Sequence, residues 1–202
     1  MEKLYHIRKF YDEEEDYHVG QILEFNKEKN NNLREYLLNS DGYYLDHYNE
    51  KQLYWERLEH IFNIDLNKVP KDKLERMKSY LNNYLHKNGM YRRESVLEEV
   101  RREKYIEKPS RYHCMWLTNE ESLDSWIMLL SAEKDHFSVF EMELDGNLFC
   151  STDELLPDPD HKLKEIYEEA EKYWNPTPKD IEDSIKREYI FEGIAKVKRK
   201  VK

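Results

Sequence analysis

The chain of 202 residues is predicted to fold as one α+β domain, and three observations lead to that class. Segments with the aromatic and β-branched residues of strands flank a long block in which apolar residues have helical spacing. The strands are separated unevenly and hairpins are expected, whereas a doubly wound parallel sheet requires regular alternation of strands and helices. Finally, 16 Tyr, 7 Phe and 4 Trp, with few Gly and Pro, indicate a folded chain with an aromatic-rich core despite its high charge.

The first predicted strand covers residues 3–10, where aromatic and β-branched residues mix with charges and no helix-capping residue precedes them. The acidic run 12–16 predicts a solvated turn. Residues 17–25 then return as extended chain, so the sheet is expected to begin with this pair of neighbouring strands.

Helical spacing of apolar residues extends from about residue 27 to about residue 108. Pro70 suits a first helical turn, Gly89 a position just past a helix end, and Ser95 the start of a capping box. These signals predict three helices, over residues 46–63, 70–87 and 95–106. Their polar faces alternate in charge, as solvated helix faces do, so no ligand site is expected on them.

After this block, strand and helix signals alternate. Residues 111–117 predict a buried strand, and Thr118 begins a second capping box for a helix that runs to about Leu130. Residues 137–144 predict another strand, which a turn at Asp145–Gly146 or Gly146–Asn147 connects to a short partner over 148–150.

The last elements are a helix and a terminal strand. Residues 163–174 place apolar side chains on one helical face, and Pro176 and Pro178 end that helix. Residues 188–197 predict either one bulged strand or two short strands bent at Gly193.

Charge and hydropathy exclude several classes of protein. The net charge is −10, and the first 195 residues hold 28 basic against 43 acidic side chains, a net charge of −15 that repels phosphate backbones. The five basic residues among the last seven predict a solvated tail. The longest apolar run, Trp126–Leu130, is far short of the roughly 18 residues of a membrane span, and residues 1–10 lack a signal peptide's apolar core. We therefore expect a cytoplasmic protein that binds neither membrane nor nucleic acid, and the scattered Cys and His predict no structural metal.

Five short motifs are distributed along the chain: Leu4-Tyr5-His6, Pro109-Ser110-Arg111, Trp116-Leu117-Thr118, Tyr173-Trp174, and Glu188 on a strand before Gly193. Together they resemble an uncharacterised bacterial family related to ADP-ribosyltransferases, in the poly(ADP-ribose) polymerase-like superfamily. The resemblance covers most of the chain outside roughly residues 26–90. It implies an ADP-ribosyltransferase-like split antiparallel sheet, within a single domain 1–202 that carries residues 26–91 as a mainly helical insertion.

The same resemblance implies roles in binding and cleaving NAD. His6 matches a histidine that holds the adenosine ribose, and Glu188 matches the glutamate of a late strand. Trp116 is the closest match to an aromatic residue that stacks on nicotinamide, with Tyr112 as the second choice. Ile7 follows His6 where a glycine is common in the superfamily, so the backbone contact to the nicotinamide amide differs here.

The chemistry of NAD cleavage accounts for these residue types. Breaking the nicotinamide–ribose bond develops positive charge on the ribose. A carboxylate that accepts a hydrogen bond from a ribose hydroxyl stabilises this charge. A cation is also needed at the pyrophosphate, for which Arg8, on the same strand face as His6, is the first candidate and Arg111, beside Ser110, the second.

Each candidate also has a structural interpretation. His6 and Trp116 could be packing residues, and the Ser110–Arg111 pair could fix a loop. Glu188 could form a standing pair with Arg8, Arg111 or a backbone amide. Whether Glu188 or Glu192 faces the site depends on where the strand is bulged.

The leading functional hypothesis is an NAD-dependent ADP-ribosyltransferase or NAD glycohydrolase with an unknown macromolecular or small-molecule acceptor. The alternative is a non-enzymatic interaction domain that keeps this fold and binds a partner through its acidic helical block, about 46–106. A nucleic-acid modifier would suit the basic tail but not the acidic body.

Overall fold

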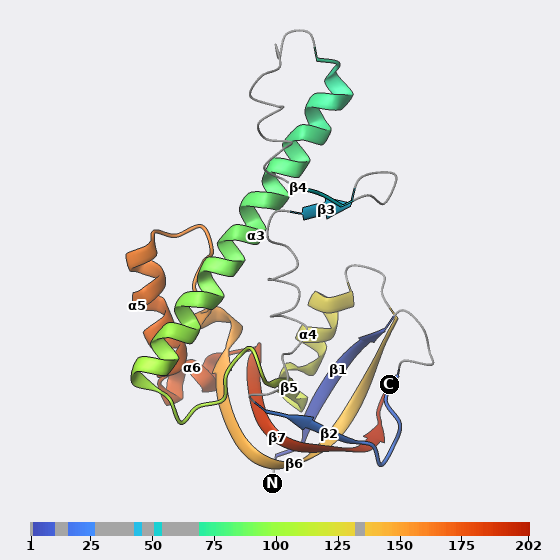
Figure 1. Cartoon of the computed structure of the whole chain (residues 1–202). Coiled ribbons are helices and arrows are strands. Elements are labelled where there is room, and N and C mark those ends of the chain that lie inside the picture. The colour runs from blue at the N-terminus through green and yellow to red at the C-terminus, as the bar shows by residue number, and fades with distance from the viewer. Residues whose placement is uncertain (1, 11–15, 27–42, 46–50, 54–68, 132–135) are drawn as a thin grey trace.

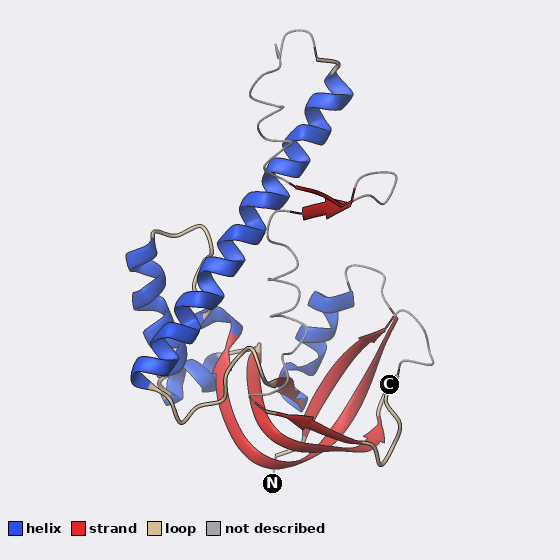
Figure 2. Cartoon of the chain, viewed as in Figure 1, coloured by secondary structure: helices blue, strands red, loops and turns tan. Residues whose placement is uncertain are grey.

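The computed structural model describes residues 2–10, 16–26, 43–45, 51–53, 69–131 and 136–202. It confirms the α+β class, because its strands form an antiparallel sheet and its helices lie outside that sheet (Figures 1 and 2). The helices are α3 (Lys71–Lys104), α4 (Glu120–Ser131), α5 (Leu163–Trp174) and α6 (Pro178–Asp183), with a short 3-10 turn at Asp153–Leu155. None of these described helices is long and apolar enough to cross a bilayer.

The main sheet has five strands in the order β2-β7-β5-β1-β6. They are β1 (Leu4–Phe10), β2 (Ile22–Phe25), β5 (Met115–Asn119), β6 (His136–Thr152) and β7 (Arg187–Lys200). Strand β6 also pairs along nearly all of β7. Strands β7, β5, β1 and β6 therefore form a closed ring of pairings, and β2 pairs with β7 outside this ring. Strands β3 (Tyr43–Leu45) and β4 (Lys51–Leu53) form a separate two-stranded sheet.

The predicted hairpin at residues 145–147 is wrong, because β6 continues through it as a single 17-residue strand. Gly146 pairs with Gly193 of β7, and both residues have positive φ, +156° and +146°. A Cβ atom on Gly146 would lie 2.4 Å from the carbonyl oxygen of Glu192. The two glycines therefore permit the paired strands β6 and β7 to approach closely where they bend, and the bend is visible at the bottom of Figure 1. Of the two alternatives for the last segment, one bulged strand is the correct one, because β7 is continuous and its register against β6 shifts by one residue between Val197 and Arg199.

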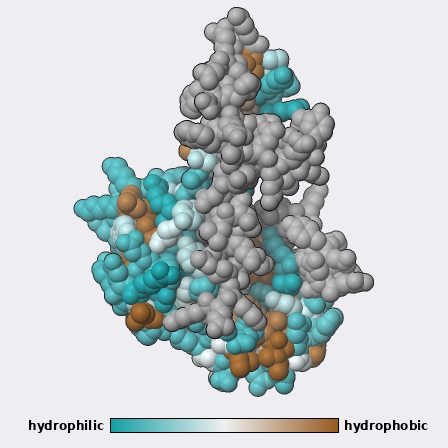
Figure 3. All heavy atoms as spheres, in the orientation of Figure 1, coloured by the Kyte–Doolittle hydropathy of each residue, from teal (hydrophilic) through white to brown (hydrophobic). Residues whose placement is uncertain are grey.

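The predicted partner of β1 is also wrong. Strand β2 pairs with β7, with Leu23 opposite Ala195, because β5 and β6 already occupy the two edges of β1. The exposed apolar residues of this region are Val19, Ile22 and Ile194. Figure 3 shows an apolar patch at the bottom of the view, over these strands.

The two helices predicted over 70–87 and 95–106 are one helix, α3. Gly89 lies inside it, where a Cβ atom would approach Cβ of Pro159 to 3.0 Å, so the glycine permits a close contact and does not end the helix. The hydroxyl of Ser95 donates to the carbonyl of Tyr91, one turn earlier, and caps nothing. Of the predicted helix 46–63, residues 51–53 form strand β4 and the rest lies outside the described residues.

Later boundaries differ by a few residues. Strand β5 begins at Met115, not at residue 111, and α4 begins after Asn119, whose side-chain oxygen accepts from the backbone N–H of Ser122. Helix α5 has its predicted bounds. Pro178 begins the additional helix α6, which Thr177 caps.

Two apolar clusters lie on opposite faces of β5 and β7. The first lies within the curved sheet and contains Leu4, Met115, Leu117, Phe140, Met142, Tyr189, Phe191, Ala195 and Val197. The second lies between the sheet and helices α3 and α5 and contains Val96, Leu97, Val100, Cys114, Ile166, Ala170, Tyr173, Trp174 and Ile190. Strand alternation therefore places the Trp116 side chain on the helix-covered face.

Candidate functional site

A buried charged cluster lies under the helices, with Arg111 at its centre. Arg111 Nε donates to Glu94 Oε2 of α3 at 2.8 Å, and Arg111 Nη1 donates to Glu188 Oε1 of β7 at 2.5 Å. Arg111 Nη1 also donates to the hydroxyl oxygen of Tyr173, on α5, at 2.6 Å. The exposed fractions of Glu94, Arg111 and Glu188 are 1%, 5% and 6%. Three elements distant in sequence thus meet at one guanidinium group, which we call the Arg111 cluster (Glu94, Arg111, Tyr173 and Glu188).

The charges of this cluster are balanced, as burial requires. Arg93 supplies a second cation, 2.9 Å from Glu94 Oε1. Burial alone would raise the pKa of Glu94, but Arg111 and Arg93 outweigh it and hold the pKa below its ordinary value. Burial opposes the charge of Arg111, yet Glu188 and Glu94 raise its pKa above the ordinary value. Glu94 and Arg111 are therefore both charged at neutral pH.

Glu188 is held through only one of its oxygens. The Tyr173 hydroxyl donates to Oε1 at 2.5 Å, and Arg111 Nη1 donates to the same atom. Burial, reinforced by Glu188, raises the pKa of Tyr173, so the hydroxyl remains a donor. Among the described residues no group donates to Oε2 of Glu188. One carboxylate oxygen is thus fixed and the other can accept a hydroxyl from a ligand.

Trp116 lies beside this cluster. The guanidinium carbon of Arg111 is 5.9 Å from the centre of the Trp116 ring and 5.1 Å from that of the Tyr173 ring. Trp116 is half-buried, whereas Tyr173 is fully buried. Arg111 therefore contacts both the Trp116 ring and the Glu188 carboxyl group.

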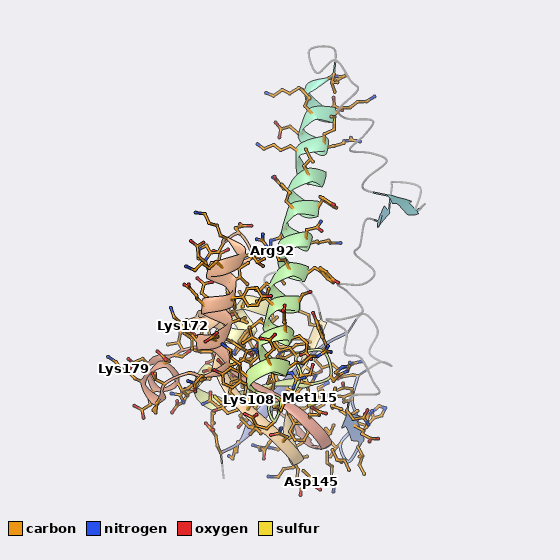
Figure 4. The ribbon with its side chains drawn as sticks, turned by 60° about the vertical axis from the view of Figure 1, so that its left-hand side comes forward. Arg92, Lys108, Met115, Asp145, Lys172 and Lys179 are labelled. Carbon is orange, nitrogen blue, oxygen red and sulfur yellow. The ribbon has the colours of Figure 1, made fainter. Side chains whose placement is uncertain are left out.

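Ser110 belongs to a neighbouring cluster that shapes the loop before β5. Its hydroxyl donates to Glu98 Oε2 at 2.9 Å, and Glu98 also accepts two bonds from Arg101. Arg101 Nη1 donates to the carbonyl of Lys108 at 2.9 Å, which closes the loop. Figure 4 labels Lys108 and Met115, at the two ends of this loop. Ser110 thus positions the loop.

Tyr112 is half-buried next to this loop and away from the Trp116 ring contacts. Its backbone N–H donates to the hydroxyl oxygen of Ser110 at 3.2 Å. Burial raises the pKa of Tyr112 to about 12. Trp116, with its contact to Arg111, is therefore the better of the two aromatic candidates.

His6 and Arg8 lie on the other face of the sheet. His6 Nδ1 bonds the backbone oxygen of Trp116 at 2.8 Å, and its ring stacks on Tyr17 with centres 5.7 Å apart. The guanidinium carbon of Arg8 is 4.3 Å from the centre of the same Tyr17 ring. Burial lowers the pKa of His6 to about 4, so the ring is neutral and donates from Nδ1. His6 and Arg8 share a face, as predicted, and His6 bonds the backbone of Trp116, whose ring lies beside Arg111.

Sequence reasoning missed Glu94, Tyr17 and the role of Tyr173. Glu94 resembles any other charge on a solvated helix, and its only signal is the spacing of four residues to Glu98, which places two acids on one face of α3. Tyr173 belongs to a quoted motif, but nothing local indicates that its hydroxyl contacts Glu188. Tyr17 follows an acidic turn and has no further signal.

The basic tail has partners within the sheet. Lys198 and Arg199 bond the two oxygens of Glu141 at 2.7 and 2.6 Å, and Lys200 bonds Asp16 at 2.8 Å. These residues are the end of β7, so they pair with acidic residues as well as contacting solvent. No three His, Cys, Asp or Glu side chains in the described ranges are placed to hold a metal ion.

No curated protein matches the chain. The model of a family described as a protein of unknown function, DUF2441, matches residues 4–202, which is nearly the entire chain. The chain therefore belongs to the DUF2441 family.

Proposed function

We propose that this protein cleaves the nicotinamide–ribose bond of NAD, as an ADP-ribosyltransferase or an NAD glycohydrolase, in the cytoplasm. The observation that carries the proposal is the state of Glu188. Its carboxyl group is buried beside Arg111, is fixed through Oε1, and receives no hydrogen bond at Oε2 from the described residues. A carboxylate held in this way suits stabilisation of a positively charged ribose.

The arrangement of the strands supports an ADP-ribosyltransferase-like split sheet. The strands of Glu188, Trp116 and His6 are neighbours, in the order β7-β5-β1. Trp116 lies opposite Ile190, two residues from Glu188, so the two side chains share a face. Strands β1 and β5 pair only at two positions and then follow different neighbours. That divergence is the proposed split.

In the proposed reaction, Glu188 Oε2 accepts a hydrogen bond from a ribose hydroxyl, and the Trp116 ring stacks on nicotinamide. The C1′–N bond breaks with its electron pair leaving on nicotinamide. Water or an acceptor hydroxyl then bonds to C1′ and gives up its proton. Glu188 stabilises the positive charge that develops between these two steps.

The adenosine half of NAD is assigned to the other face. Arg111 is already bound to two carboxylates, so Arg8 is the better cation for the pyrophosphate. His6, beside it, is proposed to hold the adenosine ribose. NAD is thus proposed to span the place where β1 and β5 separate.

Release of nicotinamide from NAD by the purified protein tests this function. Glu188→Gln keeps the volume of the side chain but removes its charge, and we expect turnover to fall at least about a hundredfold, the scale of losing one positioned stabiliser. Glu192→Gln, four residues along the same strand and opposite Asn147, is the matched control and should retain turnover. Absence of both NAD binding by calorimetry and nicotinamide release, with water or with added acceptors, would refute the proposal.

A non-enzymatic interaction domain is the second candidate, because the pair of Glu188 with Arg111 is one of the structural roles expected for this glutamate. The first half of α3 also extends away from the sheet (Figures 1 and 4). The helical block 46–106, expected to be acidic, is not acidic where the structure describes a helix, because α3 carries ten basic and six acidic residues. Its partner in this alternative would be acidic. A Glu188→Gln protein that loses thermal stability but keeps its turnover per folded molecule would favour this candidate.

A further inference from the structure

We infer that Glu94 is a positioning residue for Glu188 and acts through Arg111. The inference rests on the proposed function, since it concerns how Glu188 is prepared for NAD cleavage. Glu94 lies on α3 and bonds no atom of Glu188 among the described contacts, so its effect must pass through the guanidinium group between them.

The guanidinium group of Arg111 divides its donors between the two carboxylates. Nε and Nη2 face Glu94, at 2.8 Å from Oε2 and 3.5 Å from Oε1. Nη1 faces Glu188 and the Tyr173 hydroxyl. Because a guanidinium group is planar and rigid, binding one edge to Glu94 fixes the direction of the remaining donors.

Glu94 is itself held in place. Arg93 Nε and Nη2 donate to its Oε1 at 3.2 and 2.9 Å. Glu94 therefore presents Oε2 to Arg111 from a fixed position on α3. The alignment of Arg111 depends on this helix as well as on the loop that carries it.

This division explains why Oε2 of Glu188 is available. An arginine released from Glu94 could turn its two-nitrogen edge to Glu188 and bond both carboxylate oxygens, which is the preferred geometry of such pairs. Oε2 would then be occupied and the charge of Glu188 more fully neutralised. Glu94 prevents this by holding the Nε edge of Arg111.

Glu94→Gln removes the charge that holds the Nε edge of Arg111 and so releases the guanidinium group toward Glu188. We expect kcat to fall by between about tenfold and a hundredfold, with a smaller change in KM for NAD, because Glu188 is then no longer correctly positioned for the reaction.

Glu98→Gln is the matched control. Glu98 lies one turn further along α3 and is also buried and bound to an arginine, but that arginine is Arg101, which contacts the loop backbone. Its substitution should lower stability with a much smaller change in kcat per folded molecule. Glu94→Asp, which keeps the charge but shortens the side chain, should lower kcat by less than Glu94→Gln.

A crystal structure of Glu94→Gln tests the same step without turnover, because Arg111 should then bond both carboxyl oxygens of Glu188. If wild-type protein does not cleave NAD, the proposed function fails, while this rearrangement of Arg111 would still establish the coupling. An Arg111 that keeps its wild-type contacts in Glu94→Gln, or an equal loss of kcat in Glu98→Gln, would refute the role of Glu94. A soluble, folded Glu94→Asp with wild-type kcat would also refute it.

Discussion

Gly146 lies directly opposite Gly193, and each α-carbon occupies the space that a side chain on the other would need. The nearest backbone atoms, Glu192 oxygen and Asp145 oxygen, would lie 2.4 and 2.5 Å from the added Cβ atoms. Strands β6 and β7 bend together at this pair. After the bend, residues 193–196 of β7 pair with β2, whereas the first half of β7 carries Glu188 beneath the helices.

We therefore expect Gly146→Ala to lower the free energy of unfolding by about 3 kcal/mol, because the positive φ and the backbone overlap are each unfavourable. Chemical denaturation measures this difference. Gly20→Ala is the control, since Gly20 also has a positive φ, +89°, but has open space around it. It should lose only the conformational part, roughly 1–2 kcal/mol. Equal losses in the two variants would contradict the role of the close crossing.

The sequence predicted those elements whose signals are local. Strand β1, helices α4 and α5 and the terminal strand follow from the spacing of apolar residues and from capping residues. The sequence led to wrong predictions where one residue type can have either of two structural roles. An Asp-Gly pair indicates a hairpin turn, but Gly146 permits a crossing with a strand 47 positions later, which no local pattern reveals. Gly89 similarly permits the contact with Pro159.

A second prediction concerns the buried charge of Arg111. Arg111→Met fills similar volume but leaves Glu94 and Glu188 without their shared cation, so we expect a loss of about 3–5 kcal/mol in the free energy of unfolding. Arg102→Met is the control, because Arg102 also pairs with a buried glutamate, Glu98, but its side chain is 66% exposed. That variant should lose no more than about 1 kcal/mol. Similar losses in both would show that Arg111 is not the centre of the cluster.

For the candidate site, the family resemblance named Trp116 and Glu188, with Arg111 as the second candidate cation, and Arg111 contacts both of them. The same reasoning could not find Glu94, because its partner follows 17 positions later and the contact depends on how α3 packs against the loop. It also could not show that His6 and Arg8 face away from Glu188, since that depends on the register between β1 and β5. Long-range packing decides these features.

Lys108 is expected to stabilise the end of α5. Its ammonium group bonds the carbonyl of Trp174, the last residue of that helix, and lies 4.5 and 4.4 Å from the centres of the Tyr105 and Phe149 rings. Burial lowers the pKa of Lys108, because water no longer fully solvates its ammonium group. The aromatic rings and the carbonyl must therefore stabilise the charge instead. Lys108→Met should lower the free energy of unfolding by about 1–2 kcal/mol. Lys164→Met, an exposed lysine on α5, should change it by less than about 0.5 kcal/mol in the same denaturation experiment.

The last prediction concerns His6, whose burial gives folding a pH dependence above the range in which carboxylates titrate. The pKa of His6 is lowered from 6.5 to about 4 in the folded chain, so the unfolded chain binds more protons between these values. Stability should therefore fall as the pH falls from 7 to 5, with a slope of up to about 1.4 kcal/mol per pH unit from this residue. His6→Asn can keep a donor for the Trp116 carbonyl but cannot titrate, so this contribution to the slope should disappear. His161→Asn is the control, because the bond to Glu169 raises the pKa of His161, which adds stability at low pH that is lost as the pH rises. Its removal should leave the fall toward pH 5 in place, and parallel curves for wild type and His6→Asn would show that His6 is not buried as a neutral ring.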